Sequence, residues 1–122
     1  MKSPPNNHQM GMLGQQHAEA FLVKKGLRIL ARNYRAKTGE IDLIAQAGTY
    51  FVFIEVKSRA SLRYGQPREA VTQTKQGKII RTAQQYITYR RLGECDMRFD
   101  VIEVLFLRDN IHIKHIENAF WA

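Results

Sequence analysis

The sequence predicts a single-domain α/β protein in which helices pack against a mixed sheet. Two observations support this class. The 122 residues, 44% of them apolar, suffice for one hydrophobic core, because chains of roughly 100–200 residues usually form a single domain. Segments with helical spacing of apolar residues also alternate with strand-like apolar runs, and no Pro/Gly/Ser-rich linker separates them.

The predicted elements follow from residue spacing and from breaking residues. The stripe from Leu13 to Lys24 has helical spacing, and Gly26 stands where a helix C-cap belongs. Ala47-Gly48 indicates a turn, and Pro67 suits a helix start. Residues 1–10, with two prolines and two asparagines, are predicted to be a disordered tail before one domain over 11–122. The predicted order is a helix over 12–25, strands over 27–36, 39–46 and 49–59, a loop over 61–67, a helix from 67 or 68 to 91, and strands over 97–107 and 111–116.

Positive charge dominates the composition. Nineteen Lys and Arg residues against eleven Asp and Glu residues give a net charge of +8, which attracts polyanions such as DNA, RNA or an acidic membrane surface. No apolar run approaches the roughly 20 residues that cross a bilayer. No apolar segment follows Lys2 as it does in a secretory signal, so neither a membrane protein nor a secreted one is expected. The single cysteine, Cys95, fits a cytoplasmic location.

Charged residues at the end of an apolar strand indicate a candidate catalytic site. Glu55 and Lys57 share one face of the strand over 49–59, where they are costly unless they are paired or used. A two-residue turn at Ala47-Gly48 places Asp42 opposite Phe53, whereas a four-residue loop places it opposite Glu55. Both registers put Asp42 on the face of Glu55 and Lys57, within roughly 5–8 Å. An odd-length loop would turn Asp42 to the other face.

Such a pair of carboxylates is a candidate metal site. Two carboxylates about 5 Å apart repel by about 3 kcal/mol at an effective dielectric near 20. Mg²⁺ removes this repulsion and is typically held by one or two carboxylates together with waters and phosphate oxygens. Lys57 can then orient the attacking water or neutralise the transition state. The competing interpretation is structural: Glu55 and Lys57 form a plain ion pair, and Asp42 belongs to a polar cluster near the turn.

Four separated motifs resemble the YraN family of small bacterial proteins. They are GEIDLI at 39–44 with FIEVKSR at 53–59, YGQPREAV at 64–71, TKQ at 74–76, and RFDV at 98–101. The resemblance covers roughly residues 11–120. That family is similar to the PD-(D/E)xK nuclease superfamily and to archaeal Holliday junction resolvases. The resemblance therefore implies a restriction-endonuclease-like fold, with a mixed central sheet flanked by helices.

The resemblance also implies an activity. It implies Mg²⁺- or Mn²⁺-dependent hydrolysis of phosphodiester bonds in DNA, with branched or single-stranded DNA as the candidate substrate. Asp42 and Glu55 take the metal-binding D and E positions, and Lys57 takes the K position. Gln15 stands where relatives carry a glutamate that helps to hold the metal in resolvase-like nucleases. Either the Gln15 carbonyl oxygen or Glu19, one helical turn further on, completes the metal shell, or the site is weakened. Ile41, in place of the superfamily proline, changes no ligand.

Basic residues continue from this site along the predicted loop and second long helix. They indicate a surface for a phosphate backbone, with DNA preferred to RNA, and the alternative is a solvated helix face. Two competing functions are a non-catalytic module that grips nucleic acid, RNA included, and a protein-interaction subunit. Resolvase-like enzymes act as dimers, so the resemblance leaves a homodimer open. The basic residues are Arg59, Arg63, Arg68, Lys75, Lys78 and Arg81.

Two other sets of polar residues are interpreted as structural. Arg98 and Asp100 share a strand face and form a pair. His112 and His115 lie three residues apart on a strand, so they face opposite ways and make a poor metal pair. With a single cysteine in the chain, a zinc finger is excluded.

Overall fold

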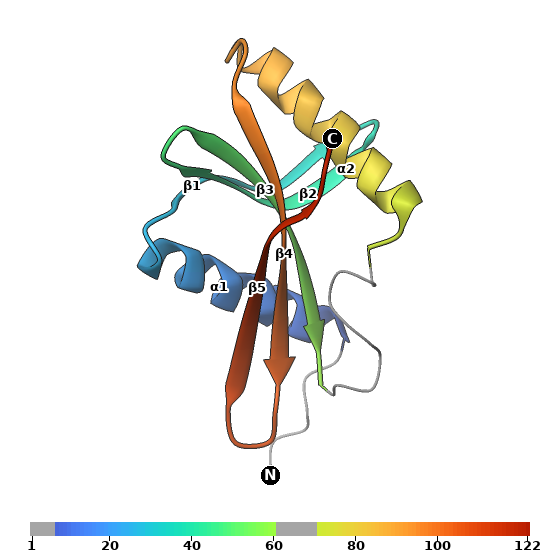
Figure 1. The fold of residues 1–122 in the computed structure, drawn as a ribbon. Coiled ribbons are helices and arrows are strands. Elements are labelled where there is room, and N and C mark those ends of the chain that lie inside the picture. The colour runs from blue at the N-terminus through green and yellow to red at the C-terminus, as the bar shows by residue number, and fades with distance from the viewer. Residues whose placement is uncertain (1–6, 61–70) are drawn as a thin grey trace.

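A five-stranded mixed sheet forms the centre of the protein. The computed structural model describes residues 7–60 and 71–122. The strands follow the order β1-β2-β3-β4-β5, and all neighbours are antiparallel except β3 and β4. The expected fold class, a restriction-endonuclease-like mixed central sheet flanked by helices in the order α-β-β-β-α-β-β, is confirmed (Figure 1). The elements are α1 (Asn7–Lys24), β1 (Arg28–Ala36), β2 (Gly39–Ala47), β3 (Tyr50–Arg59), α2 (Gln73–Tyr89), β4 (Asp96–Phe106) and β5 (Ile111–Phe120).

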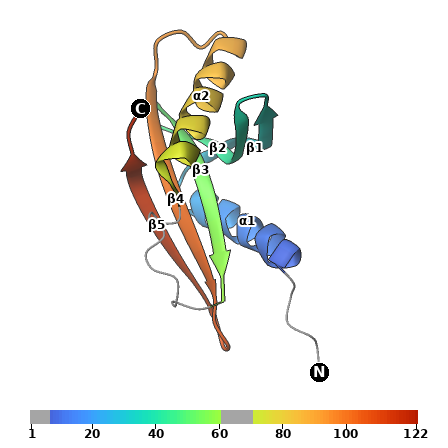
Figure 2. The ribbon, with the colours of Figure 1, turned by 90° about the vertical axis from the view of Figure 1, so that its right-hand side faces the viewer.

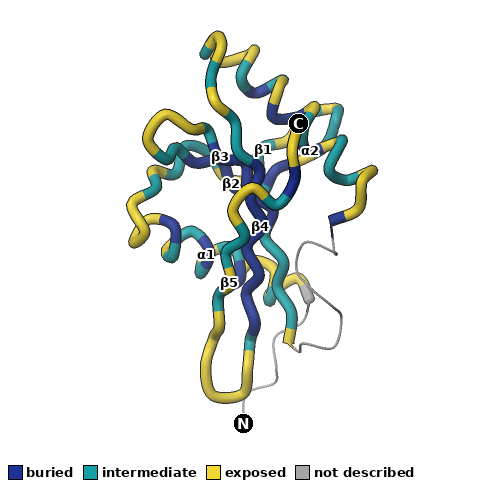
Figure 3. Tube along the Cα trace, in the orientation of Figure 1, coloured by how far each residue is buried: buried dark blue, intermediate teal, exposed yellow. Residues whose placement is uncertain are grey.

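The two helices cover opposite faces of the sheet, because apolar residues alternate along the central strands. On β3, Phe53 packs in the core beneath α2, whereas Val52 and Ile54 pack in the core beneath α1. Ala18 and Leu22 of α1 are fully buried. Figure 3 shows that the buried residues gather along the middle of the sheet. Among the described residues, no helix is long and apolar enough to cross a membrane.

The ends of three elements differ from the sequence-based predictions. The first helix begins at Asn7 rather than near residue 12, so residues 7–10 are helical rather than part of a tail. The second helix begins at Gln73, not at 67 or 68, because the Thr72 side chain caps it by accepting a hydrogen bond from the Lys75 amide at 3.2 Å. The last strand runs on to Phe120, which pairs with Phe99 and stacks on its ring. The predicted tail over 1–6 and loop over 61–67 lie outside the described residues.

The sheet opens between β2 and β3, and this opening is called the fork below. The two strands are paired from Ala47 and Tyr50, beside the turn, only as far as Leu43 and Ile54. Beyond that pair β2 continues with β1 alone, whereas β3 continues with β4. Figure 2 shows the β1–β2 hairpin turning away from β3. The fork therefore lies between residues 39–42 of β2 and residues 55–59 of β3.

The β2–β3 turn settles which of the two predicted registers forms. The turn has two residues, Gly48 and Thr49, rather than Ala47 and Gly48. Gly48 has a φ of +60°, which glycine adopts without strain. Gln46 consequently pairs with Phe51, which is the register expected for the four-residue loop. Extended by one residue beyond the last pair, this register brings Asp42 level with Glu55.

A glycine brings α1 close to the fork. A Cβ added to Gly14 would lie 1.7 Å from Oγ of Ser58 and 2.9 Å from its Cβ. No side chain fits at this point, where α1 crosses the end of β3. Gln15, the next residue on the helix, is thereby positioned beside the fork.

Gly14→Ala tests this close contact. We expect the substitution to lower the free energy of unfolding by about 1–3 kcal/mol, because the new methyl group forces α1 and β3 apart. The measurement is urea denaturation. Gly11→Ala is the matched control on the same helix, since no atom lies within 4 Å of its added Cβ. Equal stability of the two variants, or no recovery when Ser58→Gly is added to Gly14→Ala, would contradict this account.

Candidate active site

Asp42 lies at the fork, where its carboxylate takes the place of a β2 backbone carbonyl as the hydrogen-bond acceptor for β3. Its Oδ2 accepts a hydrogen bond from the backbone N–H of Val56 at 2.8 Å. β2 no longer pairs with β3 at this level, so the carboxylate satisfies a donor that the opened sheet leaves without a strand partner. Burial, and then the negative charge of Glu55, raise the pKa of Asp42 to about 6.

Asp42 reaches the fork through a break in the strand alternation. Ile41 and Ile44 both pack in the core beneath α2, although residues three apart on a regular strand face opposite ways. Asp42 lines a cavity along α1, whereas Glu55 contacts α2 through Lys75. The two carboxylates therefore approach each other through the fork. The sequence predicts that Asp42 shares a sheet face with Glu55 and Lys57. The structure instead places Asp42 towards α1 and Glu55 towards α2.

Two lysines surround the carboxylate of Glu55, which is buried. Its Oε1 lies 2.8 Å from Nζ of Lys75 and 3.7 Å from Nζ of Lys57. Burial lowers the pKa of Lys75, but the hydrogen bond and charge of Glu55 outweigh burial and leave it raised. Burial and the neighbouring Lys75 together lower the pKa of Lys57. One lysine is thus held charged against the acid, while the other is shifted towards its neutral form.

Lys75 takes a different place from the one the sequence suggested. The sequence places it among the basic residues of a surface for a phosphate backbone. In the structure its side chain reaches the site from the first turn of α2, close after the Thr72 cap. The missed signal is this cap, because a helix that starts at 67 or 68 puts Lys75 in its third turn.

A cavity of about 620 Å³ opens on the α1 side of the fork. Gln15 lies in its wall together with Asp42, so the structure brings both to one space. Glu19 also lines the cavity, but Arg32 forms an ion pair with it, with Nη2 and Oε2 3.0 Å apart. Among residues 7–60 and 71–122, no three His, Cys, Asp or Glu side chains gather as a metal-ligand group. The wall residues that bear on the site are Gln15, Glu19, Arg32, Glu40, Asp42 and Val56.

A second buried acid lies beside the site and was missed in the sequence. Glu103 of β4 is 2% exposed and forms an ion pair with Arg59. It stands next to Lys57 in the parallel β3–β4 register. Arg59, expected on the nucleic-acid surface, is thus engaged by this acid. The available signal was the repeat of Ile-Glu-Val, at 54–56 and again at 102–104, since an acid inside an apolar strand requires a partner.

The remaining basic residues divide into two groups. Lys78 and Arg81 are exposed on α2, where they remain accessible to a polyanion. Arg63 and Arg68 lie outside the described residues.

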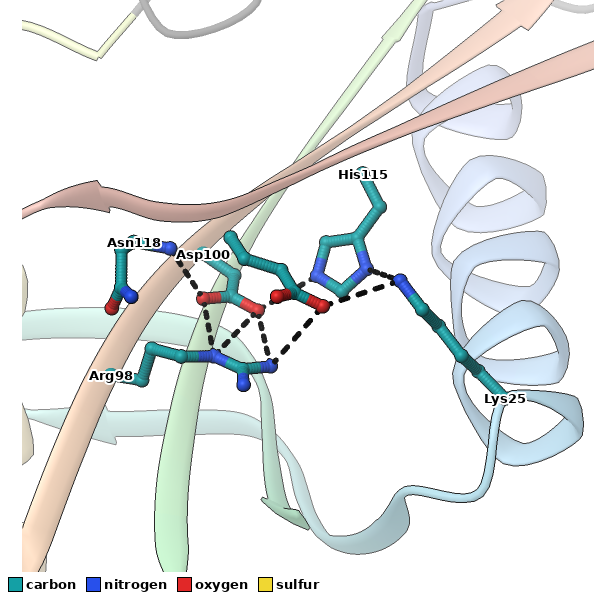
Figure 4. A network of polar contacts seen from close by, with 6 residues as sticks. Lys25, Arg98, Asp100, His115 and Asn118 are labelled. Atoms are coloured by element: carbon teal, nitrogen blue, oxygen red, sulfur yellow. Dashed lines mark hydrogen bonds and ion pairs between the residues drawn. The ribbon is translucent and has the colours of Figure 1, made fainter.

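A separate polar network joins β4, β5 and the end of α1 (Figure 4). Asp100 is fully buried. One of its oxygens lies 3.0 Å from Nη2 of Arg98 and 2.7 Å from Nε2 of His115. Asn118 donates its backbone N–H to the other oxygen at 3.1 Å. Burial raises the pKa of a carboxyl, but here the hydrogen bonds to Asp100, led by that of His115, outweigh burial and lower it.

Lys25 attaches α1 to this network. Its Nζ lies 2.9 Å from Nδ1 of His115 and 3.3 Å from Oε1 of Glu117. The contacts of Arg98 and Asp100 are those of a structural pair that fastens β5 and α1 to the sheet.

Comparison with known proteins places the chain in a family. The model of "Uncharacterised protein family UPF0102" matches residues 14–104. A UPF0102 protein of Alkaliphilus oremlandii is 48% identical, over 93% of this chain and 99% of its own length. One of Caldicellulosiruptor saccharolyticus is 44% identical over 94% and 99%. One of Trichlorobacter lovleyi is 50% identical over 93% and 91%. The chain therefore belongs to the UPF0102 family, and the resemblance to YraN proteins is confirmed at this level.

Asp42→Asn tests the electrostatics of the fork. The folded protein holds a proton on Asp42 up to a pH of about 6, whereas the unfolded carboxyl loses it near its ordinary pKa of about 4. The folded state therefore loses stability as pH rises through this interval. We expect the variant to gain about 1–3 kcal/mol of unfolding free energy relative to the parent between pH 4 and pH 7. Urea denaturation at both pH values measures this difference, with Asp109→Asn in an exposed turn as control. A constant difference between parent and Asp42→Asn would contradict the assignment.

Asp100→Asn tests the second network. We expect a loss of about 3–5 kcal/mol at pH 7, since the substitution removes the buried charge nearest to Arg98 and leaves only the more distant, exposed Glu117 at 4.0 Å. Because folding lowers the pKa of Asp100, its stabilising effect is present above the ordinary pKa of about 4 and disappears as pH falls through the folded value. Denaturation at pH 7 and pH 3 measures both effects. Glu117→Gln, an exposed member of the same network, is the control and should cost less than about 1 kcal/mol.

Proposed function

We propose that this chain is a metal-dependent nuclease that hydrolyses phosphodiester bonds in DNA, branched or single-stranded DNA included. The observation that carries the proposal is the geometry of the fork, where Asp42 is held on the Val56 amide and Glu55 lies 3.7 Å from Lys57 and 2.8 Å from Lys75. Membership of the PD-(D/E)xK superfamily, a cytoplasmic location and action as a homodimer on two-fold DNA belong to the same proposal.

The residues at the fork fit a hard divalent cation. The donor set is oxygen-rich, with the carboxylates of Asp42 and Glu55 and the amide of Gln15 on the adjoining cavity wall. Mg²⁺ is usually held by one or two protein carboxylates and completes its shell with waters and phosphate oxygens. Burial raises the pKa of Asp42 most and the charge of Glu55 adds to it; a positive charge between the two carboxylates would offset both effects. Asp42 and Glu55 would hold the ion, and Gln15 would contribute a neutral oxygen.

Each side chain has a role in hydrolysis. A bound Mg²⁺ or Mn²⁺ supplies a Lewis acid that stabilises charge on the scissile phosphate. Lys57, 3.7 Å from Glu55, can orient the attacking water or neutralise charge that develops on the phosphate. Lys75, held charged beside Glu55, can neutralise the phosphate as it enters.

The charge distribution supports nucleic acid as the substrate. The chain carries a net charge of +8, and exposed Lys78 and Arg81 continue from Lys75 along α2. A phosphate backbone that entered at Lys75 would meet these residues next.

One observation favours a second candidate, a nucleic-acid-binding module without catalysis. Lys75 and Lys57 already lie against Glu55, and Arg32 already pairs with Glu19. Gln15 is uncharged, and Glu19, the one acid that α1 contributes to this wall, is already paired with Arg32. α1 therefore offers no unpaired carboxylate to a metal ion.

Cleavage assays test the catalytic proposal. Purified protein is incubated with labelled branched, flapped, single-stranded and duplex DNA, with Mg²⁺, with Mn²⁺ or with EDTA. We expect metal-dependent cleavage that falls at least about 100-fold in Glu55→Gln and in Lys57→Ala. Lys24→Ala and Glu94→Gln, both at exposed positions, are the charge-matched controls. Cleavage by Glu55→Gln at the parent rate would refute the site.

Metal binding separates the two candidate functions. A ligand that binds only the folded state raises the melting temperature. In the nuclease proposal Mn²⁺ raises the melting temperature of the parent and has little effect on Asp42→Asn. Equal responses of parent and variant, together with binding of DNA but no cleavage, identify the module instead.

A further inference from the structure

A cavity of about 560 Å³ lies at the far end of α2 from the fork, and is called the tyrosine pocket below. Aromatic rings and cations form its wall, and none of its lining residues is acidic. Its lining residues are Tyr34, Arg35, Ala36, Lys37, Gln85, Tyr86, Tyr89 and Arg90.

The rings of the tyrosine pocket differ in how far they are buried by their neighbours. Tyr86 is buried and packs edge-on against Tyr34, with ring centroids 5.2 Å apart. Arg90 lies over the Tyr86 ring, 5.3 Å from its centroid. Tyr89, by contrast, is 76% exposed. The first two rings form a fixed floor, whereas the Tyr89 ring presents a large apolar surface to solvent that the fold does not use.

The cations of the tyrosine pocket are also accessible. Arg35 and Lys37 are exposed. Arg35 has one acidic partner, Glu40, at 3.2 Å, but both side chains of this pair are mostly exposed. Such surface pairs exchange readily for another anion, since they contribute little to stability.

A seam between α2 and the β1–β2 turn connects the tyrosine pocket to the fork. Thr38 in this turn lies with its Oγ1 2.7 Å from that of Thr82 and donates to Gln85 at 3.4 Å. A Cβ on Gly39 would lie 3.4 Å from Cβ of Lys78. Lys75, at the fork, and Tyr89, at the pocket, are 14 residues apart on α2, which spans about 21 Å.

We propose that the tyrosine pocket binds a single-stranded segment of nucleic acid, with a base stacked on Tyr89 and the backbone held by Arg35, Lys37 and Arg90. An accessible aromatic ring beside cations is the arrangement that binds single strands. Every base has a π-face that can stack on the ring, and every phosphate in the backbone carries a negative charge that the cations attract. A duplex keeps its bases stacked inside and cannot use Tyr89. The inference rests on the proposed function for its ligand class and specifies the substrate: DNA with a single-stranded extension that follows α2 from the fork.

Binding is measured without cleavage, so that this inference and the proposed function fail separately. Fluorescence anisotropy in EDTA compares a labelled single-stranded oligonucleotide with a duplex of the same length. We expect Tyr89→Ala to weaken single-strand affinity about tenfold and duplex affinity less than twofold. Tyr89→Phe should bind like the parent, because stacking needs the ring and not the hydroxyl. Tyr50→Ala, at the exposed tyrosine on β3, is the matched control.

The cations are tested by salt dependence. Lys37→Gln should reduce the slope of log affinity against log salt by about 0.7 for the single strand, the value for one lost phosphate contact. A poly-glutamate peptide serves as a competitor that carries negative charge but has no bases to stack. It should displace the oligonucleotide poorly. The inference is overturned if Tyr89→Ala retains the parent's single-strand affinity, if it weakens duplex equally, or if poly-glutamate competes as well as DNA. Single-strand binding through Tyr89 in a protein that cuts nothing would sustain the inference and refute the nuclease.

Discussion

The separation of β2 from β3 beyond the Leu43–Ile54 pair is the constraint on which the candidate site depends. Once the strands part, the Val56 amide faces a gap, and the Asp42 carboxylate fills it. A carboxylate in that place is sheltered from water and lies near Glu55, so its pKa rises. A continuous sheet would satisfy the amide with a carbonyl and would leave no space for acids to converge.

The two helices complete this opening from opposite faces. α1 is drawn against β3 at Gly14, which sets Gln15 in the cavity wall. α2 begins at the Thr72 cap, so that its first turn brings Lys75 onto Glu55. The site thus contains both acids and amines, and the balance between them decides its chemistry. In the proposed nuclease a metal ion would take up part of the negative charge, and Lys57 would orient the attacking water or stabilise charge on the phosphate.

Polar groups elsewhere in the described chain show how the fold treats buried charge. Glu103 and Asp100 are both buried on β4, and each is matched by an arginine on a neighbouring position or strand. Glu103 joins β4 to β3 through Arg59, and Asp100 joins β4 to β5 through His115 and Asn118. The fork differs because Asp42 accepts a hydrogen bond from a backbone amide, while Glu55 beside it contacts two lysines. This contrast within one molecule is the reason for proposing a ligand site at the fork and a structural role for the pairs on β4.

Local patterns in the sequence determined the element order, the mixed α/β class and the family, because helix spacing, strand runs and the GEIDLI and FIEVKSR motifs are readable along the chain. They also singled out Asp42, Glu55 and Lys57. Only the tertiary structure decided that Asp42 reaches Glu55 through a fork, that Lys75 joins them, and that Arg59 is engaged by Glu103. The reason is physical: alternation and caps act over a few residues, whereas the point at which two strands part depends on how α1 and α2 pack on the whole sheet.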